Sequence, residues 1–266
     1  MIHQLNPKIY HNEFKMLEPR PNDYALCFLG RNVLVDGNDN LFRIKDSKGN
    51  AQFLFEIDEE RFFLVDEIVV EYIEKDITYF RYYQPQHLAF AVLTGSSLYE
   101  FYRNNTYCGR CGMPMQNHEK ERSKFCMCGH IVYPKIAPAV IVGILDEQHR
   151  LLCTKYRIPR SKYHNYSLVA GYNEIGETLE DTVRREVYEE VGLRVKDIQY
   201  FDCQPWPITS SLVIGFFCKV DGSTTIRLDQ NELCEATWFT QEDLFPSQDE
   251  TTLTHFMIDY FRQGKI

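Results

Sequence analysis

Glu186, Glu189 and Glu190 are spaced to share one edge of a helix, where side chains three and four residues apart are neighbours. Like charges at this spacing destabilise an isolated helix, and the helix dipole disfavours negative charge near the C-terminal end. A bound divalent cation would remove the repulsion, and carboxylate oxygens suit Mg²⁺ and Mn²⁺. The alternative is a solvated acidic face with Arg184 and Arg185 as surface partners.

A helix over residues 178–191 would hold these glutamates. Its apolar side chains recur every fourth residue and would form one buried stripe, at Leu179, Val183, Val187 and Val191. Thr178 is predicted to cap the N-terminus together with Asp181, and Gly192 to cap the C-terminus. The preceding loop, residues 171–177, contains two glycines, so its backbone can approach a ligand closely.

Loop and helix together resemble a Nudix box. The chain reads Gly171, five residues, Glu177, seven residues and Arg185-Glu186-Val187-Tyr188-Glu189-Glu190-Val191-Gly192-Leu193, which fills every fixed position of G-x5-E-x7-R-E-U-x-E-E-x-G-U, with U aliphatic. The resemblance implies an α/β (α+β) fold in which a mixed sheet lies between helices. It also implies hydrolysis of nucleoside diphosphates linked to another group, with Mg²⁺ or Mn²⁺. Attack of water on a pyrophosphate requires the phosphoryl charge to be neutralised, which such cations do.

The same resemblance implies roles for single residues. Glu186 and Glu190 are implied to be direct ligands of the catalytic metal, and the Ala170 carbonyl is implied to contribute. Glu189 lies close by and completes the implied catalytic group of Glu186, Glu189 and Glu190.

Three further charged residues are placed by the resemblance. Glu232 occupies a family position implicated in metal binding, with Glu235 and a plain solvated loop acid as the alternatives. Glu177 and Arg185 are expected to form an ion pair that braces the loop on the helix.

Four of the nine cysteines lie close together. The order Cys108-x2-Cys111, fourteen residues and Cys126-x-Cys128 is close to the ligand spacing of a zinc ribbon. Four thiolates would make a structural site, because they leave no open position for chemistry. The fourth ligand could be Cys128 or His130. A decayed site and four unliganded thiols are the alternatives, and a thioredoxin-like redox pair is disfavoured because the first pair does not open a helix.

A zinc ribbon directly before a Nudix domain, behind a β-rich region, resembles the NADH pyrophosphatase family. Residues 133–138 fit that family, and residues 203–211 follow its pattern S-Q-P-W-P-F-P-x-S except at Cys203, Ile208 and Thr209. The resemblance implies a dinucleotide pocket lined by Gln204, Pro205, Trp206, Pro207, Ile208, Thr209, Ser210 and Ser211, with Tyr133 and Tyr172 as candidates to stack on a base.

If the family resemblance is set aside, the residues of this loop allow two interpretations. Pro205 and Pro207 fix the backbone on either side of Trp206, which would hold the ring ready for a flat base. A core tryptophan in a proline-rich loop fits equally well.

The remaining patterns predict three parts. They are an N-terminal β-rich domain with a closing helix (1–103), a zinc ribbon (104–133) and a Nudix hydrolase domain (134–266). Strands are expected at 52–57, 61–65, 77–80, 139–145, 150–156, 168–170, 194–202, 211–220 and 234–240, and further helices at 86–102 and 251–262.

The composition of the 266 residues is that of a folded soluble protein, with 44% hydrophobic and 25% charged residues, and it excludes disorder, collagen and coiled coils. The net charge of −9 argues against a large non-specific nucleic-acid surface. The longest apolar run, 137–145, is too short to span a membrane, and the first residues do not resemble a secretory signal. We therefore expect a cytoplasmic protein with reduced cysteines.

The resemblance to the NADH pyrophosphatase family implies a hydrolase that uses Mg²⁺ or Mn²⁺ to split NADH, and NAD⁺, into nicotinamide mononucleotide and AMP. Relatives in the family also remove NAD caps from RNA, and the zinc ribbon suggests a homodimer by resemblance. The departures at Ile208 and Thr209 motivate one alternative, a preference for ADP-ribose or another nucleoside diphosphate derivative. The other alternative is a non-catalytic, zinc-stabilised module that binds nucleotides or RNA.

Overall fold

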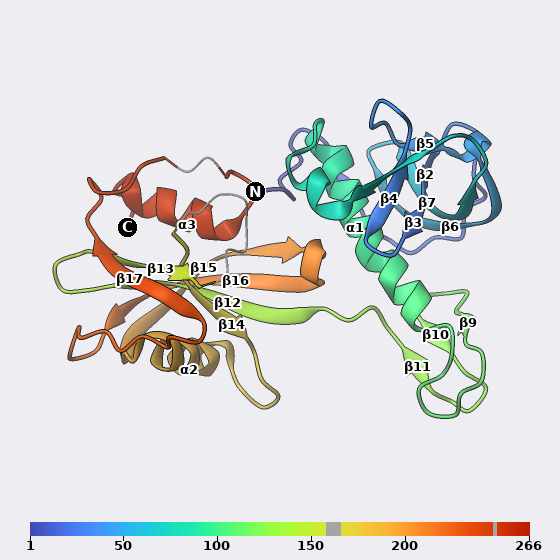
Figure 1. The fold of residues 1–266 in the computed structure, drawn as a ribbon. Helices are drawn as coiled ribbons and strands as arrows, with labels where there is room; N and C mark the ends of the chain where they lie inside the picture. The colour runs from blue at the N-terminus through green and yellow to red at the C-terminus, as the bar shows by residue number, and fades with distance from the viewer. Residues whose placement is uncertain (158–165, 247–248) are drawn as a thin grey trace. The chain divides into compact units, whose positions relative to one another are not determined.

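The computed structural model describes residues 1–157, 166–246 and 249–266 (Figure 1). They group into two units. Unit 1 contains Met1, Ile136–Trp206 and Ser211–Ile266, and unit 2 contains Ile2–Lys135 and Pro207–Ser210. The boundaries at residues 103 and 133 stay a prediction.

A six-stranded mixed sheet forms the centre of unit 1. Its strands are β12 (Ala137–Leu145), β13 (Leu151–Tyr156), β14 (Val169–Tyr172), β15 (Val195–Trp206), β16 (Ser211–Val220) and β17 (Leu233–Phe239). The order is β15-β16-β12-β13-β17, and β14 pairs with β12. Only the β12–β16 pair is parallel among these described strands. Because β12 pairs with β14 over Ala139–Val142 and reaches β13 at Leu145, the end of β14 is free to lead into the glycine-containing loop.

Two helices cover opposite faces of this sheet, α2 (Leu179–Val191) and α3 (Leu253–Arg262) (Figure 1). Side chains alternate between the faces as strand geometry requires. The α2 face is filled by Val140, Val142, Ile144, Ile214, Phe216, Val183, Val187 and Val191. The α3 face is filled by Leu145, Leu151, Cys153, Phe217, Leu253, Met257 and Phe261. Full burial of each such side chain contributes about 1.5–3 kcal/mol relative to exposure.

The ends of α2 are as the sequence predicts. The Thr178 hydroxyl accepts a hydrogen bond from the Asp181 N–H at 3.1 Å, and Gly192 ends the helix in the left-handed region at φ 71°. The predicted strands and helices of unit 1 are confirmed, and most bounds agree to within two residues. The main difference is β15, which continues to Trp206 through residues expected to form a loop.

Unit 2 contains a five-stranded sheet, order β1-β6-β7-β2-β5, and a three-stranded sheet, order β3-β4-β8. The strands are β1 (Tyr10–His11), β2 (Tyr24–Leu26), β3 (Phe28–Leu29), β4 (Asn32–Val35), β5 (Phe42–Arg43), β6 (Ser47–Ile57), β7 (Glu60–Ile68) and β8 (Ile73–Asp76). The helices are η1 (Ile44–Asp46), η2 (Ile77–Tyr82), α1 (Gln86–Asn104) and η3 (Pro207–Thr209). A third sheet follows α1, with β9 (Gln116–Asn117), β10 (Lys124–Phe125) and β11 (Ile131–Val132).

The predicted strand over 77–80 is wrong, because this segment is the 3-10 helix η2. The Asp76 carboxylate accepts a hydrogen bond from the Thr78 N–H at 2.8 Å and caps the turn. Ile77 and Phe80, three residues apart, are both buried on one side of it. Two of the aromatic and β-branched side chains that suggested a strand are therefore buried by a helical turn instead.

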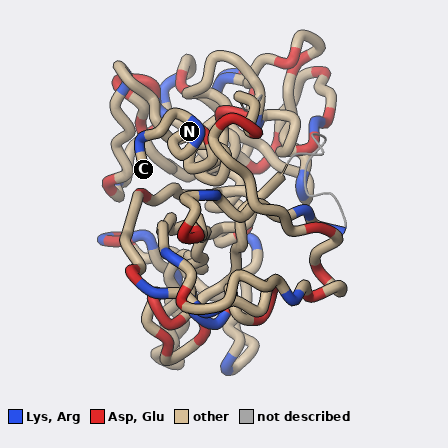
Figure 2. The backbone as a smooth tube through the Cα atoms, turned by 90° about the vertical axis from the view of Figure 1, so that its left-hand side faces the viewer, with Lys and Arg blue, Asp and Glu red and all other residues tan. Residues whose placement is uncertain are grey.

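Neither unit, within the residues that the structure describes, has a helix long and apolar enough to cross a membrane. Figure 2 shows acidic and basic residues interspersed along the backbone.

Candidate active site

Arg185 connects the glycine-containing loop to the acidic edge of α2. Its Nε and Nη2 donate to the two carboxylate oxygens of Glu177 at 2.6 and 2.9 Å, so the predicted ion pair is confirmed. Nη1 reaches Glu186 at 2.7 Å and Glu189 at 3.1 Å, and Nη2 also donates to the Tyr172 carbonyl at 2.9 Å. Mainly because of the Arg185 hydrogen bonds, the pKa of Glu177 falls from 4.5 to about 2.

Two residues that the sequence did not single out complete this brace. The Thr182 hydroxyl donates to Glu177 at 3.0 Å, and the Asn173 side chain donates to the Thr182 hydroxyl at 2.7 Å. Thr182 is fully buried one turn before Glu186, so its polar group needs these partners. The available sequence signal was the position of Thr182, three residues after Leu179 and four before Glu186, which places it beside the apolar stripe.

Glu186 lies directly against the backbone of β14. A Cβ placed on Gly171 would come within 1.9 Å of the Glu186 carboxyl carbon, so a larger residue at position 171 would force this carboxylate to move. Burial raises the pKa of Glu186, Arg185 opposes the shift, and the charges of Glu189 and Glu232 raise it further. A partly buried carboxylate among other carboxylates matches the surroundings of a cation ligand.

The other predicted residues of this edge are placed around Glu186. Glu190 is only 3% exposed, whereas the Glu189 side chain is 57% exposed. Ala170 pairs with Ile141 in the β14–β12 ladder, one residue before Gly171. The edge therefore combines a buried, a partly buried and an exposed carboxylate.

Glu232 and Glu235 differ in their partners. Glu235 receives hydrogen bonds from Lys155 at 3.0 Å and from the Tyr166 hydroxyl, so its carboxylate is already occupied. Glu232 is exposed just before β17, its carbonyl accepts the Arg157 N–H at 2.8 Å, and its charge is felt by Glu186. Of the two, Glu232 is the better candidate for a metal ligand.

The predicted substrate-binding residues are divided between the units. In unit 1, Tyr172 is 51% exposed and its hydroxyl lies 3.3 Å from that of Ser211. Pro205 and Trp206 are in β15, where Trp206 pairs with Ser211. Pro205 is tolerated there because β15 is an edge strand and a proline lacks the N–H that an inner strand needs.

The side chain of Gln204 is buried and hydrogen-bonded to the backbone at the start of α3. Its side chain is 1% exposed, its Nε2 donates to the Thr251 carbonyl at 2.7 Å and its Oε1 accepts the Leu253 N–H at 2.6 Å. It therefore joins β15 to the start of α3, and its amide is not presented to a ligand.

The remaining predicted residues belong to unit 2. Pro207, Ile208, Thr209 and Ser210 form η3 and the turn after it, and the Pro207 carbonyl accepts a hydrogen bond from Ser97 of α1 at 2.6 Å. Tyr133 is 52% exposed, and its hydroxyl donates to Glu121 at 2.8 Å.

The four cysteines of unit 2 form a second cluster. The sulfur atoms of Cys108, Cys111, Cys126 and Cys128 all lie within 4.8 Å of one another. The Cys108–Cys128 and Cys111–Cys126 separations are 3.7 and 3.5 Å, close to the spacing of about 3.8 Å that tetrahedral Zn–S bonds of about 2.3 Å require. Among the described residues, no other set of three or more such ligand atoms gathers this closely.

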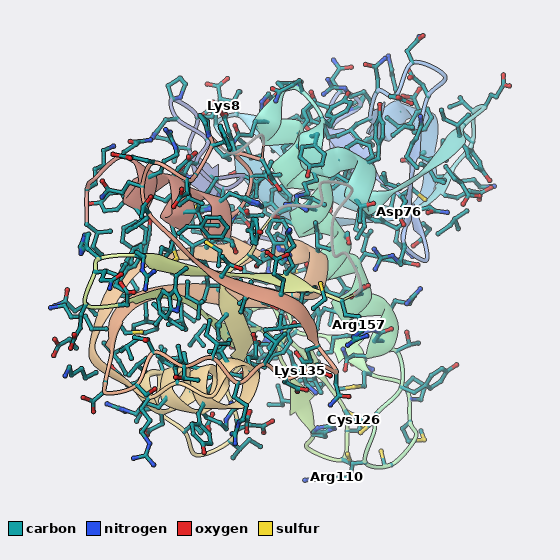
Figure 3. All side chains as sticks on the ribbon, turned by 60° about the vertical axis from the view of Figure 1, so that its left-hand side comes forward. Lys8, Asp76, Arg110, Cys126, Lys135 and Arg157 are labelled. Atoms are coloured by element: carbon teal, nitrogen blue, oxygen red, sulfur yellow. The ribbon has the colours of Figure 1, made fainter. Side chains whose placement is uncertain are left out.

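Tight backbone turns bring these sulfur atoms together. Gly112 and Gly129 follow the two pairs with φ of 74° and 83°, which tight turns require. The Arg110 N–H points at the Cys108 sulfur at 3.4 Å, and Figure 3 shows Arg110 and Cys126 in the loops of this region. His130 lies beside the cluster, with Nδ1 3.3 Å from the Cys108 sulfur. The geometry favours Cys128 over His130 as the fourth ligand.

Comparison with protein families gives one match to this chain. Residues 135–260 match the NUDIX domain family. This part of the chain is a Nudix domain. The resemblance predicted from Gly171 to Leu193 is therefore confirmed, and Glu186, Glu189 and Glu190 lie on its helix.

The chain is also similar in sequence to curated proteins. The chain is 42% identical over 151 residues to the "NAD-capped RNA hydrolase NudC" of Salmonella heidelberg and 43% identical to that of Salmonella agona. Each match covers 56% of this chain and 57% of the relative, so the chain spans little more than half the length of these proteins. A solved NUDIX hydrolase from Nitrosomonas europaea aligns with a TM-score of 0.48 at 24% identity, over 59% of this chain and 91% of that one.

Proposed function

We propose that the chain is a metal-dependent hydrolase that splits the pyrophosphate of NADH and NAD⁺ into nicotinamide mononucleotide and AMP. The observation that carries the proposal is the acidic edge of the Nudix helix, where Glu186 fits against Gly171 and Arg185 braces the loop on the helix. The names of its relatives point to NAD-linked substrates.

Glu186, Glu190, Glu232 and the Ala170 carbonyl would hold Mg²⁺ or Mn²⁺. Such a cation supplies neutralisation of phosphoryl charge during hydrolysis. The donor set fits by its chemistry, because Glu186 and Glu190 offer carboxylate oxygens at least partly buried on α2, and glycine at position 171 lets the Glu186 carboxylate lie against β14. Arg185 meanwhile keeps Glu186 and Glu189 close to each other by offsetting their repulsion.

The predicted pocket residues have distinct parts in this proposal. Tyr172 and Tyr133, each about half exposed, are the candidates to stack on a base. Pro205 to Ser211 would line the dinucleotide pocket, and the buried Gln204 would fix the strand that leads to it. Zn²⁺ at the four cysteines would stabilise unit 2, and its closed thiolate set leaves it no part in the hydrolysis.

We also propose that the chain removes NAD caps from RNA, acts in the cytoplasm and forms a homodimer. All nine cysteines are free of disulfides, which is the state expected in a reducing compartment such as the cytoplasm. Exposed apolar side chains in the zinc region support a partner surface: Tyr107, Met113, Met127 and Ile131.

ADP-ribose is the second candidate substrate. Ile208 and Thr209 replace residues of the family's pocket pattern, and the loss of a ring at Ile208 would weaken selection of the nicotinamide, which ADP-ribose lacks. A non-catalytic nucleotide- or RNA-binding module stays the alternative of another class.

A product assay tests the proposal. Purified chain is incubated with NADH, NAD⁺, ADP-ribose and an NAD-capped RNA, with Mg²⁺ or Mn²⁺ or with chelator, and the products are resolved by chromatography. Metal-dependent appearance of nicotinamide mononucleotide and AMP from NADH is the expected result. Cleavage of ADP-ribose alone would favour the second candidate, and binding without cleavage would favour the binding module.

A further inference from the structure

An open groove lies across α2 from the acidic edge. It has a volume of about 340 Å³ and is lined by Arg184, Tyr188, Leu193, Arg194, Val195 and Asp221. Arg184 and Tyr188 are one turn apart, and Glu186 lies two residues from each, about 200° around the helix. The groove is therefore separate from the glutamates that would hold the catalytic metal.

The walls of the groove are basic although the chain carries a net charge of −9. Arg184 and Arg194 are exposed, and the Arg227 guanidinium stands 5.4 Å from the centre of the Tyr188 ring. The Asp221 carboxylate forms an ion pair with the Lys196 ammonium group at 3.0 Å, which offsets its negative charge. Arg184 also meets Asp181 at 3.0 Å, but both side chains are more than half exposed, so this pair is weak.

An aromatic ring and an apolar floor lie between these arginines. Tyr188 is 45% exposed, while Leu193 and Val195 are buried beneath the surface. The backbone of Arg227 is fixed beside the ring because its main-chain N–H donates a hydrogen bond to the Val191 carbonyl at 2.9 Å. A Cβ on Gly192 would come within 2.8 Å of the Arg227 Cβ, so glycine at this position lets the arginine approach.

We propose that this groove binds single-stranded RNA, with a base on Tyr188 and phosphates at Arg184, Arg194 and Arg227. The inference rests on the proposed function, since it assigns the groove to the RNA body of an NAD-capped substrate. Basic side chains that flank an exposed aromatic ring are the usual means of binding single strands without sequence preference. A strand that leaves the acidic edge has only to cross α2, a helix about 10–12 Å in diameter with its side chains.

The test compares wild type, the double variant Arg184→Gln/Arg194→Gln and the variant Tyr188→Leu on NADH and on NAD-capped RNA. Arg103→Gln is the matched control, because Arg103 is also exposed and also stands over a tyrosine, at 5.2 Å from the Tyr99 ring. Binding of a short uncapped RNA is measured in parallel by fluorescence anisotropy at several salt concentrations.

We expect NADH kinetics within about twofold of wild type in all variants. For capped RNA, KM rises about tenfold in the double variant, and the slope of log affinity against log salt falls by about 0.7 for each phosphate that the variant no longer neutralises. Tyr188→Leu weakens RNA binding at least about fivefold, and Arg103→Gln changes nothing.

Unchanged RNA binding in both groove variants overturns the inference, as does an equal loss on NADH and capped RNA, which would show a structural effect on α2. If wild type cleaves neither substrate, the proposed function fails. The anisotropy measurement still decides the groove in that case, because it requires no turnover.

Discussion

The cysteine cluster of unit 2 and the acidic edge of unit 1 are both groups of metal-ligand side chains, but they are assembled differently. The four sulfurs lie within 4.8 Å of one another, while the carboxylates of α2 do not gather in this way among the described residues. Instead, Arg185 shares its guanidinium between Glu186 and Glu189. A structural site is closed by its own ligands, whereas a hydrolytic site must keep positions open for substrate and water.

The largest effect is expected at the closed cluster. Cys126→Ser removes one ligand of a site whose metal supplies about 10 kcal/mol or more of folding free energy in zinc-finger peptides. We expect zinc content to fall from one per chain to near zero and unit 2 to unfold at lower temperature. Elemental analysis and thermal unfolding measure this, with the exposed Cys234→Ser as control. One zinc per chain in Cys126→Ser would show that this sulfur is not a ligand.

The open edge predicts a different response. Glu232→Gln is expected to lower kcat for NADH about 100- to 1000-fold, the range seen when one group that stabilises transition-state charge is removed. Glu235→Gln changes kcat only a few-fold, because Glu235 is bound to Lys155 and Tyr166. Steady-state kinetics of both variants decide between them, and the reverse order of effects would exchange their roles.

A smaller effect on kcat is expected at Gly171. The added methyl of Gly171→Ala would overlap the Glu186 carboxyl and displace it, and misplacing a reacting group by about 1 Å costs up to about 100-fold in rate. The fold should persist, as circular dichroism can verify. Gly37→Ala is the matched control, since its Cβ would meet nothing within 4 Å. Wild-type kcat in Gly171→Ala would mean that Glu186 need not stay where the structure places it.

How far these features were predictable depends on their range along the chain. The α2 helix and its caps follow from spacing within a few residues, and the pairing of Glu177 with Arg185 was implied by the resemblance to the Nudix box. The burial of Gln204 against Leu253 and the occupation of Glu235 by Tyr166 depend on segments far apart in sequence. The path of β15 through Pro205 depends on its position at the sheet edge, which the local pattern does not encode.

The smallest predicted effect concerns acid stability. The pKa of Glu177 in the folded chain, about 2, lies below its ordinary value of 4.5, so the Arg185 pair stabilises the fold above pH 4.5. That contribution is lost as pH falls from about 4.5 toward 2. Urea midpoints at pH 7 and pH 3 should therefore differ less in Glu177→Gln than in wild type. Glu174→Gln, in the same loop, should retain the full difference, and an unchanged pH dependence in Glu177→Gln would refute the contribution of this ion pair.

The most direct test of the difference between the two clusters is NADH hydrolysis by protein that retains zinc but has been stripped of weakly bound divalent cations. We predict no turnover until Mg²⁺ or Mn²⁺ is added. Turnover should then be restored in wild type, and Glu190→Gln should stay several orders of magnitude slower at an unchanged zinc content. Full turnover without added metal, or wild-type rates in Glu190→Gln, would contradict the assignment of the acidic edge as the open catalytic site.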